Sequence, residues 1–146
     1  MHIRRMSYED ISTVDRINKL CLPENYPLEF YHLCISFFSP YCLVVEINGE
    51  VVAYLIAKVE ERVGHIISLA VLEKYRGHNI GTGLMLQLIE NMISDKVKSI
   101  SLYVRISNIQ AIKFYRKLSF YFYCTCEKYY PDGEDAYKMK KDLDYY

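Results

Sequence analysis

The sequence predicts an α/β protein with a mixed, mostly antiparallel sheet of about seven strands and about four flanking helices. Three observations support this prediction. Apolar residues alternate with polar ones in several short runs, they recur at helical spacing in others, and turn-forming residues separate the two kinds of run. No repeat or Pro/Gly/Ser-rich linker divides the chain, so we expect one domain over residues 1–146. The predicted order of elements is βααβββαβαββ.

The N-terminal third is expected to form one strand and two helices. Ser7, with Asp10 three positions later, resembles a capping box, and Pro23 would end the helix that this box opens. The apolar residues expected to share the buried face of this helix are Ile11, Val14, Ile17 and Leu20. The other predicted ranges are residues 1–6 for the strand and residues 28–38 for the second helix.

The rest of the chain is expected to alternate strands with two helices. Asn48-Gly49 is a strong hairpin signal, and Val63-Gly64 is expected to form the next turn. One helix follows a glycine-rich segment near residue 80, and the other follows Ser107-Asn108. The predicted strands cover residues 41–47, 50–60, 65–71, 99–105, 120–128 and 136–141, with the turn Pro131-Asp132-Gly133 between the last two.

The composition excludes several classes of protein. The 18 basic residues balance 18 acidic ones, so the bulk charge suggests neither nucleic acid nor a membrane as partner. The five cysteines lack the even number and spacing of a disulfide framework. Cys124 and Cys126 lack the second Cys/His pair of a metal site, so we expect core cysteines and no metal. The N-terminus has no apolar signal region, so we expect a cytoplasmic protein.

The most specific motif is the segment of residues 75–84, Tyr-Arg-Gly-His-Asn-Ile-Gly-Thr-Gly-Leu. Its glycines would let the backbone approach an anion, and the helix that follows would offer unpaired N–H groups in its first turn. The spacing fits neither a P-loop nor the dinucleotide-binding pattern G-x-G-x-x-G. Taken alone, the motif is equally compatible with an ordinary glycine-rich turn.

The segment resembles the acyl-CoA pyrophosphate loop of GNAT-fold acetyltransferases, Arg/Gln-x-x-Gly-x-Gly/Ala, on residues 78–83. His78 replaces the usual Arg or Gln and Asn79 a frequent Gly, which removes a charge but no backbone donor; His78 could also be a solvated loop residue. Residues 68–71, Ser-Leu-Ala-Val, resemble the pantetheine-binding strand of the family. Asn108 and Tyr115, two helical turns apart, match its Asn-x-x-Ala-x-x-x-Tyr motif, in which the tyrosine points at the CoA sulfur. The residues implied in binding acetyl-CoA are Leu69, Val71, Arg76, Gly77, His78, Asn79, Gly81, Thr82, Gly83, Asn108 and Tyr115.

Within this family the chain resembles the catalytic subunits of NatA-type N-terminal acetyltransferases. Leu-Pro-Glu-Asn-Tyr at residues 22–26 is similar to their peptide-entrance loop, and Leu-Tyr-Val-Arg-Ile-Ser-Asn at 102–108 to their Leu-His-Val-Arg-x-Ser-Asn. Tyr103 therefore replaces their histidine. Residues 128–130 and 133–137 match their substrate hairpin, in which Tyr129 and Tyr130 would point to opposite faces of a strand. The resemblance implies catalytic roles for Glu24, Arg105 and Tyr115, and substrate-binding roles for Leu22, Glu24, Tyr26, Tyr129 and Tyr130. Glu24 could instead be a solvated loop carboxylate, and Arg105 a structural ion-pair partner.

The implied reaction is acetyl transfer from acetyl-CoA to the α-amine of protein N-termini, including those of nascent polypeptides. Deprotonating an α-amine of pKa near 8 at pH 7 costs only ~1.4 kcal/mol, against ~4.6 kcal/mol for a lysine. The resemblance also implies ribosome association and a helical-repeat auxiliary subunit that contacts the first two helices. Ser, Ala, Gly or Thr would be preferred with that partner, and acidic first residues without it. The alternatives are a lysine or small-amine acetyltransferase and a non-catalytic CoA-binding module.

Overall fold

Seven strands form one sheet in a computed structural model that describes residues 1–143. In chain order they are β1 His2–Arg5, β2 Cys42–Ile47, β3 Glu50–Glu60, β4 Val63–Val71, β5 Ser99–Arg105, β6 Tyr121–Cys126 and β7 Ala136–Asp142. Their order in the sheet is β1-β2-β3-β4-β5-β7-β6. Only the β4–β5 pairing is parallel, so the predicted mixed, mostly antiparallel sheet is confirmed.

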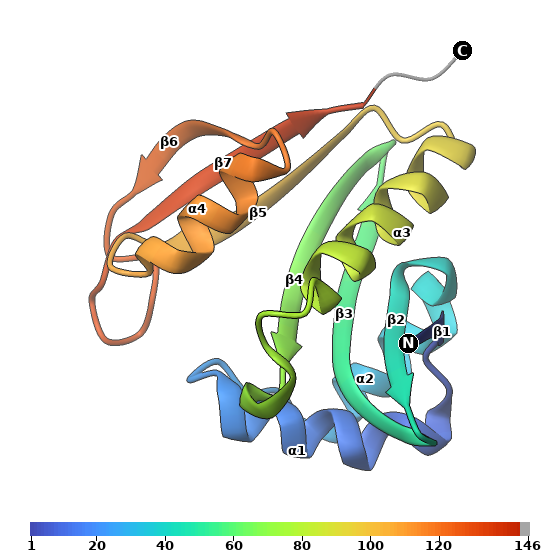
Figure 1. Cartoon of the computed structure of the whole chain (residues 1–146). Coiled ribbons are helices and arrows are strands. Elements are labelled where there is room, and N and C mark those ends of the chain that lie inside the picture. The colour runs from blue at the N-terminus through green and yellow to red at the C-terminus, as the bar shows by residue number, and fades with distance from the viewer. Residues whose placement is uncertain (144–146) are drawn as a thin grey trace.

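The helices cover both faces of the sheet (Figure 1). The α-helices are α1 Ile11–Cys21, α2 Leu28–Phe38, α3 Ile80–Ser94 and α4 Ile109–Lys117, and short 3-10 helices lie at Tyr8–Asp10, Ser39–Tyr41 and Glu73–Tyr75. The helices α1 and α2 pack on one face, and α3 and α4 pack on the other. In the part of the chain that the structure describes, no helix has the length and apolarity needed to cross a membrane.

Alternation along β2 and β3 divides the core into two layers. Leu43 and Leu55 face α3, where Leu84, Leu88 and Met92 are fully buried. The side chains one residue further along each strand point the opposite way, as the pleat requires. These are Val44 and Ile56, which pack with α1 and α2.

The sheet splits open between β4 and β5. These strands are paired only where Val63, Gly64 and His65 lie opposite Ser99, Ile100 and Ser101. Beyond His65 they diverge, so β1–β4 and β5–β7 form the two sides of a wedge (Figure 1). The divergence leaves the second half of β4 without a strand partner on the side of β5. The wedge opens at the carboxyl ends of both strands, where ligands of such sheets commonly bind.

Two predictions about the first half of the chain are wrong. Leu20 is 70 % exposed, because the buried stripe of α1 continues through Asn18 towards Cys21. At 100° per residue, Leu20 lies about 125° around the helix from the middle of that stripe. The turn predicted at Val63-Gly64 lies instead at residues 61–62, both of which have positive φ, so β4 begins at Val63.

Two predictions near the C-terminus also need correction. Tyr129 and Tyr130 lie in a loop between β6 and β7, because the Tyr130 carbonyl accepts a hydrogen bond from the Gly133 N–H at 2.8 Å and closes a turn. They therefore do not alternate across a strand. Cys124 and Cys126 are only half-buried rather than core residues, because β6 is the edge strand of the sheet.

Candidate active site

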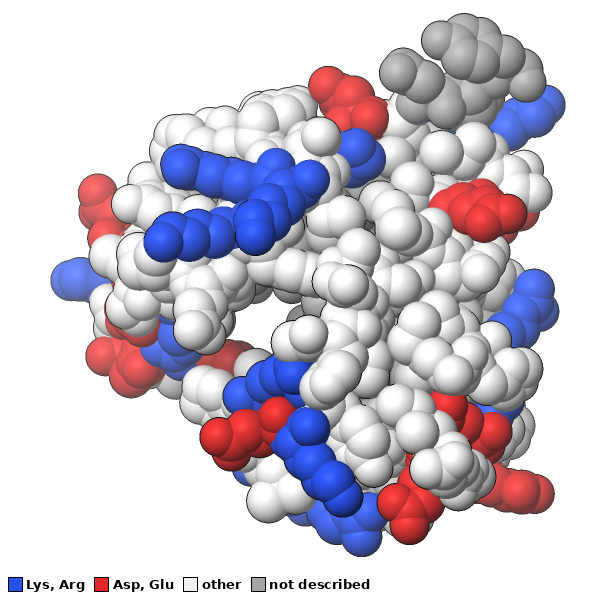
Figure 2. Space-filling view, in the orientation of Figure 1, with Lys and Arg blue, Asp and Glu red and all other residues white. Residues whose placement is uncertain are grey.

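Two cavities meet inside the wedge between β4 and β5. The first, of about 520 Å³, lies between α3, α4 and the end of β4; the second, of about 590 Å³, lies between β4, β5 and the loops at residues 22–26 and 129–131. Figure 2 shows the surface hollowed between the half that carries α4 and the half that carries α1. Five residues line both cavities: Leu22, Leu69, Asn108, Ala111 and Tyr115. Two ligands could therefore approach each other at these residues from opposite sides.

The loop before α3 presents backbone donors to the first cavity. Gly77 and Asn79 have positive φ, of 82° and 61°, which brings the chain sharply into the helix. Asparagine tolerates this conformation better than most residues, so it can stand in for a glycine at position 79. The first N–H groups of α3 have no partner within the helix and carry its positive dipole end. The loop is therefore an anion site built mainly from backbone.

Nine of the eleven residues implied in binding acetyl-CoA line the first cavity, and two do not. His78 is exposed, and its Nδ1 lies 3.3 Å from the Tyr75 carbonyl. A side chain at Gly83 would meet Met1 and Ile3, away from the cavity. A Cβ at Gly81 would lie 3.4 Å from the ring of Phe114, so this glycine allows α3 and α4 to approach closely.

The open edge of β4 offers further backbone groups. The Val71 carbonyl accepts a hydrogen bond from Arg76 Nε at 2.8 Å, and the Ile67 carbonyl accepts one from the Tyr26 hydroxyl at 3.4 Å. Both carbonyls thus face away from β3. Because strand residues alternate, the N–H and C=O of Leu69 face the same open edge. They can bind an amide of an extended ligand, as a neighbouring strand would.

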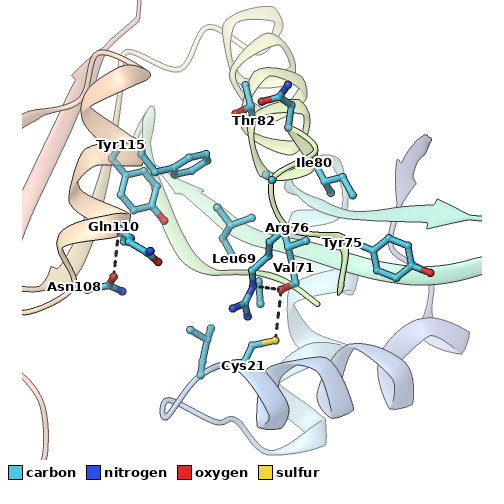
Figure 3. A pocket seen from close by; sticks show the side chains of 17 residues that line it. Cys21, Leu69, Val71, Tyr75, Arg76, Ile80, Thr82, Asn108, Gln110 and Tyr115 are labelled. Atoms are coloured by element: carbon cyan, nitrogen blue, oxygen red, sulfur yellow. Dashed lines mark hydrogen bonds between the residues drawn. The ribbon is translucent and has the colours of Figure 1, made fainter. Parts of the chain in front are cut away.

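Asn108 and Tyr115 connect α4 to this cavity. Asn108 caps α4, since its Oδ1 accepts the Ala111 N–H at 3.2 Å. Figure 3 shows the Tyr115 side chain extending from α4 into the cavity, towards Leu69. Burial raises the pKa of Tyr115 to about 12, so the hydroxyl stays protonated at neutral pH. It makes no hydrogen bond to any other residue between 1 and 143, which leaves it free to donate one to a ligand.

Arg105 holds together the two loops that border the second cavity. Its Nη2 lies 2.7 Å from Glu24 Oε1, and its Nη1 lies 2.7 Å from Asp132 Oδ2 and 2.8 Å from Glu134 Oε1. The guanidinium also lies 4.0 Å from the centre of the Tyr130 ring. The Glu134 carboxylate is the main cause of the raised pKa of Arg105. Arg105 therefore has the geometry of an ion-pair partner, at the wall of the cavity.

Glu24 keeps one carboxylate oxygen available in this arrangement. Both hydrogen bonds from Arg105, from Nε at 3.0 Å and from Nη2 at 2.7 Å, go to Oε1. Within residues 1–143, Oε2 accepts no hydrogen bond. The carboxylate lines the second cavity and is about one-third exposed. A proton acceptor, or an acceptor for a ligand N–H, is thus present beside the junction of the two cavities.

Aromatic side chains form much of the second cavity wall. Tyr26 stacks on Phe30 with ring centres 4.6 Å apart, and burial raises its pKa to about 12. Tyr129 stacks on Tyr103 at 4.5 Å, so the residue that replaces a histidine packs the loop against β5. Tyr130 is almost completely buried. All five residues implied in substrate binding, Leu22, Glu24, Tyr26, Tyr129 and Tyr130, line this cavity.

The sequence analysis missed His65, the one imidazole that lines either cavity in the part of the chain that the structure describes. Its Nδ1 lies 2.9 Å from Ser101 Oγ, and burial lowers its pKa, so the ring is neutral at pH 7. A histidine inside the otherwise apolar segment of residues 63–71 was the signal available. Among residues 1–143, no group of three or more His, Cys, Asp or Glu side chains could hold a metal ion.

The chain matches proteins of known kind along most of its length. Residues 11–120 match the Acetyltransferase (GNAT) family. An N-alpha-acetyltransferase of Sulfurisphaera tokodaii is 36 % identical over 97 % of this chain and 92 % of its own. The N-terminal acetyltransferase A complex catalytic subunit NAA10 of Arabidopsis thaliana is 39 % identical over 97 % of this chain and 77 % of its own. The structure of Ard1 from Thermoplasma volcanium superimposes with a TM-score of 0.94 at 28 % identity, over 98 % of this chain and 97 % of the other. The chain therefore belongs to the GNAT family of acetyltransferases.

Proposed function

We propose that this enzyme transfers the acetyl group of acetyl-CoA to the α-amine of protein N-termini, with the NatA-type preference for Ser, Ala, Gly or Thr exposed by Met removal. The observation that carries the proposal is the meeting of two cavities at Leu69 and Tyr115. One cavity has the donors for a pyrophosphate and an extended amide chain. The other has aromatic walls and a carboxylate suited to a peptide amine.

The first cavity fits acetyl-CoA through groups of this chain. The first turn of α3 and the loop at Gly77 would bind the pyrophosphate through N–H groups, and the open edge at Leu69 would bind the pantetheine amides. The Tyr115 hydroxyl would lie near the sulfur. Its pKa of about 12 exceeds that of an ordinary thiol, ~8.5, so it would stabilise the departing thiolate by hydrogen bonding rather than by complete proton transfer.

The second cavity would hold the acceptor amine. The amine nitrogen attacks the acetyl carbonyl carbon, the C–N bond forms, the C–S bond breaks, and the electron pair leaves with the sulfur. Glu24 would take the proton that the amine loses, directly or through a water molecule. One carboxylate is sufficient for this task, because a neutral α-amine costs only ~1.4 kcal/mol at pH 7. Positioning of the amine against the thioester would supply most of the acceleration.

Exposed apolar side chains on α1 and α2 support the proposal that an auxiliary subunit binds there. Phe37 is 72 % exposed, and the other large apolar side chains exposed on these helices are Leu20, Leu28 and Leu33. Leu33 and Phe37 are four residues apart and share one face of α2, where a partner would cover them. We propose a helical-repeat partner that carries the enzyme to ribosomes in the cytoplasm, which fits the name of the Arabidopsis thaliana relative as a subunit of a complex.

A thiol-release assay with acetyl-CoA and a panel of peptides tests the acceptor. We expect turnover of peptides that begin with Ser, Ala, Gly, Thr or Asp. A peptide with a blocked α-amine and one internal lysine should give none, and mass spectrometry should place the acetyl group on the α-nitrogen. Comparable acetylation of the lysine would favour the second enzymatic hypothesis. Binding of acetyl-CoA without turnover of any amine would favour the CoA-binding module.

The same assay tests the effect of the partner. We expect the free chain to prefer acidic first residues and the chain in its complex to prefer Ser, Ala, Gly or Thr. Equal efficiency on Ser- and Asp-peptides in both states would contradict the proposed coupling between partner and specificity.

A further inference from the structure

A buried asparagine lies directly beneath the loop that borders both cavities. Asn18, in the last turn of α1, has no exposed surface. Its Nδ2 donates to the Glu24 carbonyl at 3.0 Å and to the Tyr54 hydroxyl at 2.9 Å. Its Oδ1 accepts a hydrogen bond from Asn25 Nδ2 at 2.9 Å. Every polar group of this side chain is therefore used.

These bonds hold the loop at residues 22–26 against the last turn of α1. Asn25 Nδ2 also donates to the Leu22 carbonyl at 3.1 Å, and the Leu22 N–H donates to the Asn18 carbonyl at 2.9 Å. The Asn18 side chain thus holds Glu24 and Asn25 directly, and it holds Leu22 through the amide of Asn25. Leu22 lines both cavities, and Glu24 lines the second.

A second branch leads from Asn18 to the wall of the second cavity. Tyr54, also without exposed surface, shares a hydrogen bond of 2.7 Å with Ser68 Oγ. Ser68 lines the second cavity on β4, next to the bulge where Ile67 has no partner on β3. The asparagine therefore connects the Glu24 loop with the strand that borders the substrate from the other side.

Neither helix formation nor burial explains an asparagine at this position. Asparagine is a weaker helix former than leucine, and a buried amide costs free energy unless all its hydrogen bonds are made. A leucine has the same branched arrangement of side-chain heavy atoms and would need no hydrogen-bond partners in this position. The contacts of the amide are therefore the reason for its presence, and they lead to the Glu24 loop and to β4.

We propose that Asn18 is a positioning residue for the reaction: it holds the Glu24 loop against β4 so that the Glu24 carboxylate lies in the second cavity, two residues from Leu22, which lines both cavities. This inference rests on the proposed function. Asn18 touches neither cavity, so it acts only through the groups that it holds. Small displacements of a positioned group far from the chemistry can lower a rate by as much as about a hundredfold.

A double-mutant cycle between N18L and E24Q tests this proposal. If Asn18 acts through Glu24, N18L lowers kcat/KM for a Ser-peptide about tenfold in the parent and less than about twofold in the E24Q background. Acetyl-CoA affinity, measured by calorimetry, stays unchanged. Equal losses in both backgrounds would overturn the proposal. An inactive parent would instead overturn the proposed function, so the two failures are distinguishable.

Two further variants separate positioning from stability. Asn91 on α3 has a similar pair of bonds, to the Pro40 carbonyl and from Gln87, but lines neither cavity. N91L should lower thermal stability and leave kcat/KM unchanged, and a loss equal to that of N18L would contradict the proposal. If N18L does not fold, the exposed Asn25 allows the same cycle with N25A, which removes the bonds to Asn18 and Leu22. Full activity of N25A would then be the contradicting result.

Discussion

The anion site and the strand edge of the first cavity present backbone groups to a ligand, whereas the polar groups of the second cavity are side chains from distant parts of the chain. The N–H groups before α3 and along β4 belong to two short segments, residues 69–71 and 76–82. The ion pairs of Arg105 instead join segments that are far apart in the sequence. Arg105 lies more than 80 positions after Glu24, and Asp132 and Glu134 lie more than 100 positions after it. A backbone site tolerates changes of side chain, such as His78 and Asn79, provided that φ and the N–H groups are kept. A side-chain site depends on every partner.

The largest effect should come from a change that alters the backbone-built cavity. A Cβ at Gly81 already lies 3.4 Å from Phe114, so the branched side chain of Gly81→Val must displace that ring and occupy the approach to the first turn of α3. We expect acetyl-CoA binding to fall by at least about a hundredfold in calorimetry. Thr82→Ala keeps the N–H and should bind within about threefold of the parent. Unchanged binding by Gly81→Val would show that the loop is not the anion site.

Removal of the Arg105 side chain should impair the use of the peptide substrate, which the second cavity would hold, without affecting the first cavity. Arg105→Leu leaves three carboxylates without their common cation and frees both loops. We expect kcat/KM for a Ser-peptide to fall about a hundredfold, with acetyl-CoA affinity unchanged. Arg105→Lys should recover little of this loss, because one ammonium cannot reproduce the forked contacts. A parallel loss of acetyl-CoA affinity would contradict the separation of the two cavities.

A smaller effect is expected from Glu24→Gln. If the carboxylate takes the amine proton, kcat should fall roughly ten- to a hundredfold with acetyl-CoA affinity unchanged. The loss should shrink above about pH 8, where the amine is neutral without help. A pH–rate profile of kcat from pH 6.5 to 9.5 provides the measurement. A constant deficit would make Glu24 a positioning group only, and a normal kcat would make it a solvated loop residue.

The smallest expected effect is the contribution of His65 to the pH dependence of the free energy of unfolding. Burial lowers the pKa of this imidazole in the folded state, so below about pH 6.5 the unfolded chain binds more protons there. This contribution to the free energy of unfolding is therefore complete above the unfolded pKa and is lost as pH falls towards the folded pKa. Denaturant titrations at pH 5.5 and 7.5 should show a smaller difference for His65→Gln than for the parent. An equal difference would mean that His65 titrates as in an open chain.

The sequence predicted what depends on local signals. The order of the elements and the start of α3 follow from hydrophobic periodicity and from glycine spacing, which act over a few residues. The resemblance to acetyltransferase motifs, which are also short, implied residues that line the first cavity. Leu20 was misplaced because periodicity alone does not say where a buried stripe is centred. Tyr129 and Tyr130 were assigned to a strand because the predicted turn began only at Pro131, whereas β6 ends at Cys126 and the turn closed by Gly133 already includes Tyr130.

The side-chain cavity was predictable only in part. The motifs indicated Glu24 and Arg105 separately. Their ion pair depends on a long-range contact between the loop at residues 22–26, which follows α1, and the end of β5. The Asn18 network has no local signature, and the isolated histidine at position 65 becomes informative only once β3, β4 and β5 are placed side by side. Residues of this kind are found from packing rather than from spacing.

The most direct test is a crystal structure with CoA joined through an acetyl bridge to the α-nitrogen of a Ser-peptide. The account predicts that the pyrophosphate contacts the first turn of α3 and that the pantetheine pairs with Leu69. The bridge should pass beside Tyr115, and the peptide should lie against Glu24 and Tyr26. A conjugate whose CoA and peptide parts lie in the same cavity, or whose bridge lies away from Tyr115, would contradict the division between the two cavities.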